Sequence, residues 1–185
     1  MVPTVECAVW EDLPDILLLQ QQTHDWHSRR FPEAFPPWEL GRDMCLVALR
    51  KHFPRKWVVG PMRPSKSAFV IRDAGGVAGH CLTRLWTEPM HGRSVLYIED
   101  ITVRDTTRGQ GLGQRLLDHA AAMAKVERCS GISATIWGGN EASRMLFERN
   151  GYGVVQMDMF RSIGMDSGVE ADDAEASSGP EEALP

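Results

Sequence analysis

Three glycines and an arginine stand together where an apolar helical pattern begins. The segment Arg108-Gly-Gln-Gly-Leu-Gly113 has glycine at every second position, and the helical pattern starts at Leu112. Glycine lets a backbone approach a ligand closely because it has no Cβ, and the first amides of a helix have no partner within it. Such a loop is a typical site for an anion, most often a phosphate. The alternative interpretation is a glycine-rich turn that only begins a helix.

Two common phosphate-binding motifs do not fit this loop. A nucleotide P-loop ends in Gly-Lys-Ser/Thr, whereas Gln114 and Arg115 follow Gly113. A dinucleotide fingerprint needs a further Gly or Ala at the position of Gln114. The pattern that remains is Arg-x-x-Gly-x-Gly, formed by Arg108, Gly111 and Gly113.

A strand and a helix must position this loop. Val95, Tyr97, Ile101 and Val103 fit the two-residue period of a strand, and their apolar face predicts a central one. After the loop, apolar residues recur at helical spacing and predict one buried stripe. They are Leu112, Leu116, Leu117, Ala120, Met123 and Ala124.

The remaining elements predict an α/β (α+β) domain. Strands are expected at residues 5–10, 68–72, 77–86, 132–137 and 154–163, with the second and third forming a hairpin. The helix between the strands at 95–103 and 132–137 indicates a parallel crossover. Further helices are expected after Asp12, which can act as the cap, after the aromatic loop 31–38, and at 141–149, where Gly151 ends the helix. In the second of these, Leu40, Met44, Val47 and Ala48 share one face.

Composition limits the function classes. The 185 residues suffice for one domain with a sizeable core. Seven acidic residues follow Arg161 without any Lys or Arg, so the preceding residues carry +2 although the whole chain carries −5. We therefore expect a domain at 1–163, a disordered acidic tail at 164–185, and no nucleic-acid partner. The four scattered cysteines form no Cys-x-x-Cys pair and fit reduced thiols in a cytosol.

Three other features of the sequence each allow a functional interpretation that the surrounding residues do not support. His24 and His27 could bind a metal, but no further ligand is nearby, so two exposed histidines are expected and no metal. The basic stretch 50–66 fits a solvated connection better than a nucleic-acid site. The N-terminal segment lacks the long apolar run of a signal peptide or membrane span.

Two motifs in order resemble the GNAT superfamily of acyl-CoA-dependent N-acyltransferases. The glycine loop resembles the pyrophosphate loop of that family, and its second motif matches Asn140, Ser143, Leu146, Phe147 and Gly151. The resemblance covers most of residues 4–163. It implies the GNAT fold, a central mixed and mostly antiparallel sheet of about seven strands flanked by about four helices, splayed at the cofactor strand.

The resemblance also implies where acetyl-CoA lies. The pantetheine arm would pair with the backbone of 101–103, the pyrophosphate would rest on the amides of 108–113, and an N–H near Ile101 would polarise the acyl carbonyl. Asn140 and Ser143 would flank the cofactor. The implied cofactor residues are Ile101, Thr102, Val103, Arg108, Gly109, Gln110, Gly111, Leu112, Gly113, Asn140, Ser143 and Phe147.

The stretch 97–103 looks like the same strand of polyamine (diamine) N-acetyltransferases, in which a glutamate at the position of Glu99 is the general base. An alkyl amine has a pKa of about 10.4, so it must lose a proton before it attacks. Side chains alternate along a strand, so Glu99 and Asp100 share one cleft only if a bulge intervenes. The alternative is a solvent-facing or salt-bridged Glu99.

One position departs from the family pattern. Many members carry at the position of Phe147 a tyrosine that protonates the leaving thiolate, which phenylalanine cannot do. Water, Tyr97 or Tyr152 could substitute, and Tyr152 is retained as a second candidate catalytic residue. Its alternative is a core tyrosine at the start of a strand.

The expected function is transfer of acetyl from acetyl-CoA directly to a primary amine in a ternary complex, with a polyamine or other small amine as acceptor. The alternative is a non-catalytic acyl-CoA-binding module that reports the acyl-CoA level to a partner. The expected protein is a cytoplasmic homodimer that does not bind membranes.

Overall fold

The computed structural model of the protein describes residues 3–53, 65–87 and 92–159. Their sheet has the strand order β1-β2-β3-β4-β5, with β4 and β5 parallel and the other neighbours antiparallel. The strands are β1 Val5–Cys7, β2 Lys66–Asp73, β3 Gly76–Thr87, β4 Ser94–Val103 and β5 Gly131–Ala134. The helices are α1 Leu13–Arg30, α2 Trp38–Arg50, α3 Leu112–Val126 and α4 Glu141–Arg149, with 3-10 turns at Trp10–Asp12 and Asp105–Thr107.

The expected α/β architecture with four helices and a parallel crossover through α3 is confirmed, but the expectation of about seven strands is wrong for the described residues. The predicted strand at 154–163 does not form over 154–159, and residues 160–163 lie outside the described part. Val154 and Val155 are 75% and 94% exposed, so their apolar pattern has no packing surface to hold it in a sheet.

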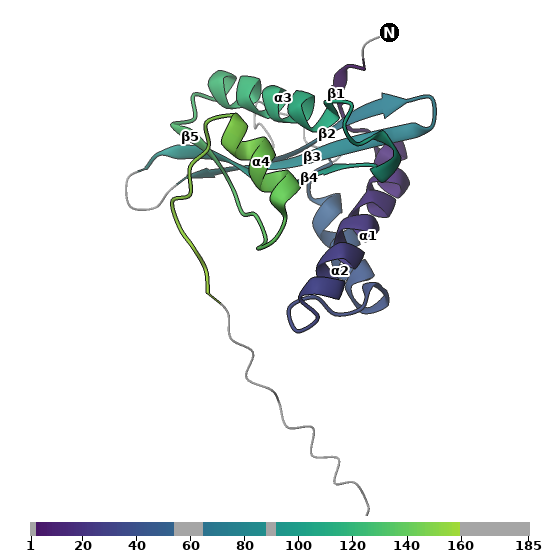
Figure 1. Cartoon of the computed structure of the whole chain (residues 1–185). Coiled ribbons are helices and arrows are strands. Elements are labelled where there is room, and N and C mark those ends of the chain that lie inside the picture. The colour runs from purple at the N-terminus through teal and green to yellow at the C-terminus, as the bar shows by residue number, and fades with distance from the viewer. Residues whose placement is uncertain (1–2, 54–64, 88–91, 160–185) are drawn as a thin grey trace, which may run out of the picture. The chain divides into compact units, whose positions relative to one another are not determined.

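Helices cover both faces of the sheet (Figure 1). On one face, Leu116, Leu117 and Ala120 of α3 and Phe147 of α4 pack against Leu96 and Ile98 of β4. On the other face, residues of α1, α2 and the first strands form a second core. Its buried members include Ile16, Leu19, Leu49, Val70, Val77 and Leu82. The α3 stripe that the sequence predicts is thus confirmed.

The predicted face of α2 is wrong. Leu40, Met44 and Val47 are 73%, 78% and 56% exposed, whereas Trp38 and Leu49 are the buried residues of this helix. Trp38 packs edge-on against His24 of α1, with ring centroids 5.2 Å apart. Burial of these two side chains, near the two ends of α2, sets the rotation of the helix. The spacing of apolar residues alone does not reveal this rotation.

A register shift in β4 changes which residues face each side. Leu82 of β3 pairs with Asp100 and Thr83 pairs with Ile98, so Glu99 is an extra residue at a β-bulge. Ile98 packs with the α3 core before the bulge, and Ile101 packs there after it. Glu99 and Asp100 therefore both point toward the α1 and α2 side.

β4 and β5 separate beyond the bulge. Their pairing runs from Val95 with Gly131 to Ile98 with Ala134, while β4 continues to Val103. Residues 99–103 consequently have no strand partner on their β5 side in the described sheet. This is the expected splay, and it leaves backbone groups available to a ligand that adds as a strand.

The chain divides into a unit at Met1–Val155 and a second unit at Gln156–Pro185. The predicted tail at 164–185 and most of the basic stretch, residues 54–64, lie outside the described residues. Among the helices that the structure describes, none is both long and apolar enough to cross a membrane.

Candidate active site

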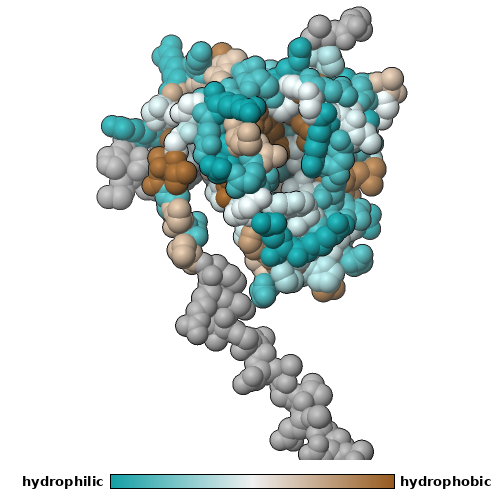
Figure 2. All heavy atoms as spheres, in the orientation of Figure 1, coloured by the Kyte–Doolittle hydropathy of each residue, from teal (hydrophilic) through white to brown (hydrophobic). Residues whose placement is uncertain are grey.

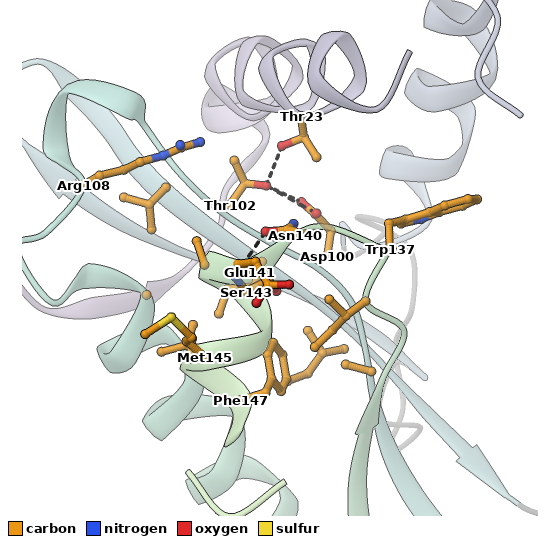
Figure 3. A pocket seen from close by; sticks show the side chains of 18 of the residues that line it. Thr23, Asp100, Thr102, Arg108, Trp137, Asn140, Glu141, Ser143, Met145 and Phe147 are labelled. Atoms are coloured by element: carbon orange, nitrogen blue, oxygen red, sulfur yellow. Dashed lines mark hydrogen bonds between the residues drawn. The ribbon is translucent and has the colours of Figure 1, made fainter. Parts of the chain in front are cut away.

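A cleft of about 1040 Å³ opens where β4 and β5 separate. Its walls are β4, the glycine loop, α4, the segment after β5 and one side of α1 (Figure 3). Most of the predicted site residues line it, and the structure thus brings them together from three separate parts of the chain. They are Glu99, Ile101, Thr102, Val103, Arg108, Gly109, Gly111, Leu112, Gly113, Asn140, Ser143 and Phe147. Gln110 and Tyr152 are not among the lining residues.

The glycine loop has the backbone that the sequence suggests. Gly109 and Gly111 have φ angles of +77° and +73°, and Gly111 is the residue that precedes α3. A Cβ on either would meet no described atom within 4 Å, so conformation rather than crowding requires glycine. Arg108 pairs with Asp105 at 2.6 Å and stays 63% exposed. The loop therefore places the first amides of α3 and a positive charge beside the cleft.

α4 supplies the opposite wall. Asn140 Oδ1 accepts a hydrogen bond from Ser143 N at 3.1 Å and thereby caps the helix (Figure 3). Phe147 is 3% exposed and packs edge-on against Tyr152, with centroids 4.9 Å apart. Burial, together with nearby Cys81, raises the pKa of Tyr152. Its hydroxyl is buried with no hydrogen-bond partner among the described residues. By contrast, Tyr97 lines the cleft and bonds Thr135 Oγ1 at 2.8 Å.

Glu99 lies among three cationic or ionisable side chains. Both its oxygens lie 2.7 Å from Lys66 Nζ, Oε2 lies 2.7 Å from His52 Nε2, and Oε1 lies 2.9 Å from Arg84 Nε. Burial by itself raises the pKa of Glu99, but the hydrogen bonds and charges of Lys66 and His52 outweigh it and hold the pKa below its ordinary value. The role of Glu99 as the general base stays a prediction. Its contacts are those of the alternative interpretation, a salt-bridged glutamate.

Asp100, which the sequence pattern singles out only as the neighbour of Glu99, has its own set of contacts. Its Oδ2 lies 2.6 Å from Gln20 Nε2 of α1 and 2.5 Å from Nε2 of His80, which is fully buried in β3. Thr102 bonds the same carboxylate and is bonded by Thr23 at 2.9 Å (Figure 3). A bulge at Glu99 was the condition for finding both carboxylates in one cleft, and no sequence signal marks that bulge.

Aromatic side chains form the end of the cleft near Asp100. Trp26, His27 and Trp137 line it, and Phe31 and Phe35 pack behind Trp137 with centroids 5.5 and 4.6 Å away. The expectation that His27 is exposed is wrong, because its ring stacks on Phe35 and 9% of it is exposed. Burial lowers the pKa of His27. The negative charge of nearby Asp100 acts in the opposite direction but is the smaller effect. Burial of this histidine depends on Phe35 and Trp137, which sequence spacing does not connect to it.

The chemistry of the site is limited by its side chains. Within residues 3–53, 65–87 and 92–159, no three His, Cys, Asp or Glu side chains are grouped as metal ligands. Burial, with the charge of Asp100, raises the pKa of Cys45 to about 11, so that thiol is a poor nucleophile at neutral pH. The cleft combines the glycine loop at the start of α3 on one side with carboxylates on the other. Most of the face in Figure 2 is polar, with apolar residues showing in patches.

The comparisons identify the class of protein that this fold and site define. The model of the acetyltransferase (GNAT) family matches residues 20–152, so the chain belongs to that family and is a GNAT-type acetyltransferase. Among curated proteins, no sequence matches this chain.

Solved structures share the fold at low sequence identity. A mutant protein from Bacillus halodurans is 18% identical, with a TM-score of 0.72 over 86% of this chain and 98% of its own. A putative acetyl transferase from Pyrococcus furiosus is 22% identical, with a TM-score of 0.68 over 87% and 99%. A ribosomal-protein-alanine N-acetyltransferase from Brucella melitensis biovar Abortus 2308 is 15% identical, with a TM-score of 0.62 over 88% and 100%.

Proposed function

We propose that this acetyltransferase moves acetyl from acetyl-CoA directly to a primary amine in a ternary complex. One observation carries the proposal: the glycine loop at the start of α3 and the two carboxylates at the bulge of β4 open into the same cleft. An anion site and a proton acceptor on opposite walls are what this reaction needs. The acceptor that the strand at 97–103 suggests is a polyamine or another small amine.

The cofactor would occupy the wall formed by the loop and α4. Its pyrophosphate would take the amides of 108–113, and its pantetheine would pair with the unpartnered side of residues 101–103. The Ile101 N–H would stabilise the oxyanion. Asn140, Ser143 and Phe147 line the same cleft and would contact the cofactor.

Departure of the CoA thiolate would need little help. A thiol pKa of about 8.5 makes thiolate a tolerable leaving group. Tyr97 presents its hydroxyl near the cleft, whereas the hydroxyl of Tyr152 is buried. Tyr97 is therefore the better placed tyrosine to donate a proton, and Tyr152 would serve as packing for Phe147.

The proposal is tested by release of CoA. Purified protein is given acetyl-CoA with a panel of primary amines, and free thiol is followed with time. Amine-dependent release is expected, together with the acetylated amine by mass spectrometry. Binding of acetyl-CoA without release for any amine would instead indicate a non-catalytic acyl-CoA sensor. The expectations of a homodimer and a cytoplasmic location stay predictions.

Replacing Gly111 with alanine is expected to weaken acetyl-CoA binding about tenfold. The new methyl points into open space at the start of α3, where the pyrophosphate would lie, and alanine disfavours the φ of +73°. Calorimetric titration of acetyl-CoA measures the effect. Gly92→Ala is the matched control, because Gly92 has a φ of +62°, an added Cβ there would meet no described atom within 4 Å, and Gly92 is not among the residues that line the cleft. Equal affinities for Gly111→Ala and wild type would argue against the loop as the phosphate site.

Replacing Phe147 with tyrosine is expected to leave kcat unchanged or raise it by up to about tenfold, because a hydroxyl at this wall adds a proton donor for the thiolate. Steady-state kinetics of CoA release measures the effect. A collapse of kcat at an unchanged melting temperature would contradict the prediction.

A further inference from the structure

Two carboxylates at the bulge of β4 face the cleft, and their contacts differ. We propose that Asp100, held by Gln20 and His80, binds the ammonium group of the acceptor and takes its proton, and that the acceptor is a singly charged primary amine with an apolar, ring-bearing body. The inference rests on the proposed acetyl transfer and names its acceptor class.

Glu99 has little capacity left for an incoming amine. Lys66 bonds both its oxygens, and His52 and Arg84 each approach one of them. These contacts link β2, β3 and the turn that follows α2. A carboxylate surrounded in this way is a structural anion, because an ammonium ion would have to displace cations that already hold it.

Asp100 has one oxygen available. Oδ2 meets Gln20 and His80 at 2.6 and 2.5 Å, whereas Oδ1 has only the contact of Thr102 at 3.3 Å among the described residues. Its side chain is 20% exposed. The three contacts on Oδ2, which include Thr102 Oγ1 at 3.1 Å, fix the carboxylate and leave Oδ1 as the less occupied oxygen that can accept from a ligand.

Nε2 of His80 is best assigned as a hydrogen-bond donor to Asp100. Its Nδ1 is buried with no hydrogen-bond partner in the described part of the chain, so a proton there would be unsatisfied. A ring proton therefore belongs on Nε2, which lies 2.5 Å from Asp100 Oδ2 and 3.0 Å from Gln20 Nε2. His80 thus positions the carboxylate.

The charge of the described cleft wall suits one ammonium group. Its carboxylates are Glu99, Asp100 and Glu141. Glu99 is paired as described, and Glu141 bonds Arg144 on the surface of α4. Asp100 is thus the one described lining carboxylate with no Lys or Arg bonded to it. A polyamine, which carries two or more charges, would lack a second carboxylate here.

The wall next to Asp100 suits a ring. Trp26, His27 and Trp137 line the cleft on this side, and Trp137 remains 40% exposed. Aromatic faces contact both an apolar body and the cation attached to it. In Figure 3, Trp137 extends from the segment after β5 beside Asp100 of β4. An amine carried by a short chain from an aromatic ring would contact both.

The proposed step conserves every proton. The acceptor ammonium gives one proton to Asp100 Oδ1, and the neutral nitrogen attacks the thioester carbon. The N–C bond forms, the C–S bond breaks, and sulfur leaves as thiolate. The nitrogen loses its second proton as the amide forms. One of the two protons ends on CoA sulfur, and the other passes to solvent.

The acceptor class is tested with three probes at saturating acetyl-CoA: 2-phenylethylamine, butylamine and butane-1,4-diamine. We expect kcat/KM to be at least about tenfold higher for 2-phenylethylamine than for the other two. Trp137→Leu should reduce that preference without abolishing turnover of butylamine. A preference for the diamine, or no turnover of 2-phenylethylamine by protein that binds acetyl-CoA, would overturn the proposal. Failure to bind acetyl-CoA would instead count against the proposed function.

The role of Asp100 is tested with Asp100→Asn, which should lower kcat/KM for 2-phenylethylamine about 100-fold. The loss should shrink for phenylhydrazine, which is already neutral at pH 7.5, and acetyl-CoA should still raise the melting temperature. Asp43→Asn, on the exposed side of α2, is the matched control. A larger loss in Glu99→Gln than in Asp100→Asn, with both variants folded, would overturn the assignment.

The role of His80 as a positioning residue is tested with a pair of variants. His80→Gln keeps an N–H that can reach Asp100, and His80→Leu removes it. We expect kcat to fall at least about tenfold more in the leucine variant, with KM for acetyl-CoA unchanged in both. Equal values of kcat in the two variants, at similar melting temperatures, would overturn this role.

Discussion

Replacing Leu116 with alanine is expected to lower the free energy of unfolding by about 3 to 4 kcal/mol. Leu116 is fully buried on α3, in the core formed with Leu96 and Ile98 of β4. The change removes apolar contacts and leaves a cavity under the helix that the glycine loop begins. Urea unfolding followed by circular dichroism measures the loss.

Leu18→Ala is the matched control for this core. Leu18 is also a helical leucine, on α1, but it is 64% exposed. Its replacement should change the unfolding free energy by less than about 0.5 kcal/mol. Equal losses in the two variants would contradict the packing of α3 against the sheet.

Replacing Glu99 with glutamine is expected to lower the unfolding free energy by about 2 to 3 kcal/mol at pH 7, because Lys66 and Arg84 lose the carboxylate that they share. The side chain of Glu99 is 21% exposed, which places the cost below that of a fully buried pair. Glu6→Gln is the control, because Glu6 also pairs with an arginine but is 57% exposed. Its loss should stay below about 1 kcal/mol.

The effect of Glu99 should depend on pH in one direction. Its cationic neighbours hold the pKa below the ordinary 4.5 despite burial, so the folded state favours the ionised form. The stabilisation is complete above about pH 4.5 and is lost as the pH falls from there through the folded pKa. The difference between wild type and Glu99→Gln should therefore shrink below pH 4.5. A difference that grows with acidity would contradict this ion-pair network.

The parts of the fold that local patterns specify were predictable. The helix that begins at Leu112 has a clear apolar stripe, and the turn between β2 and β3 needs residues such as Gly76, whose φ is +98°. Gly151, with φ of +81°, ends α4 as expected. In each case the signal and the structure that it predicts lie within a few residues of each other.

The features that sequence did not reveal depend on distant contacts. The bulge at Glu99 arises in the pairing of β4 with β3, and it turns Asp100 toward His80 and Gln20. The rotation of α2 likewise follows from the packing of Trp38 and Leu49. The glycine loop and Asn140 could be predicted to line the cleft because backbone geometry and capping are local. The aromatic wall could not, because it joins α1, the loop after it and the segment after β5.

The most direct test of the cofactor site is a melting curve with and without acetyl-CoA, with ATP and NADH as controls. At a hundredfold excess over Kd, binding should add about 2.7 kcal/mol to stability and raise the melting temperature by about 5 to 10 °C for a chain of this size. A rise with acetyl-CoA and not with the controls is the predicted result. No rise in folded protein would contradict the assignment of the cleft to acetyl-CoA.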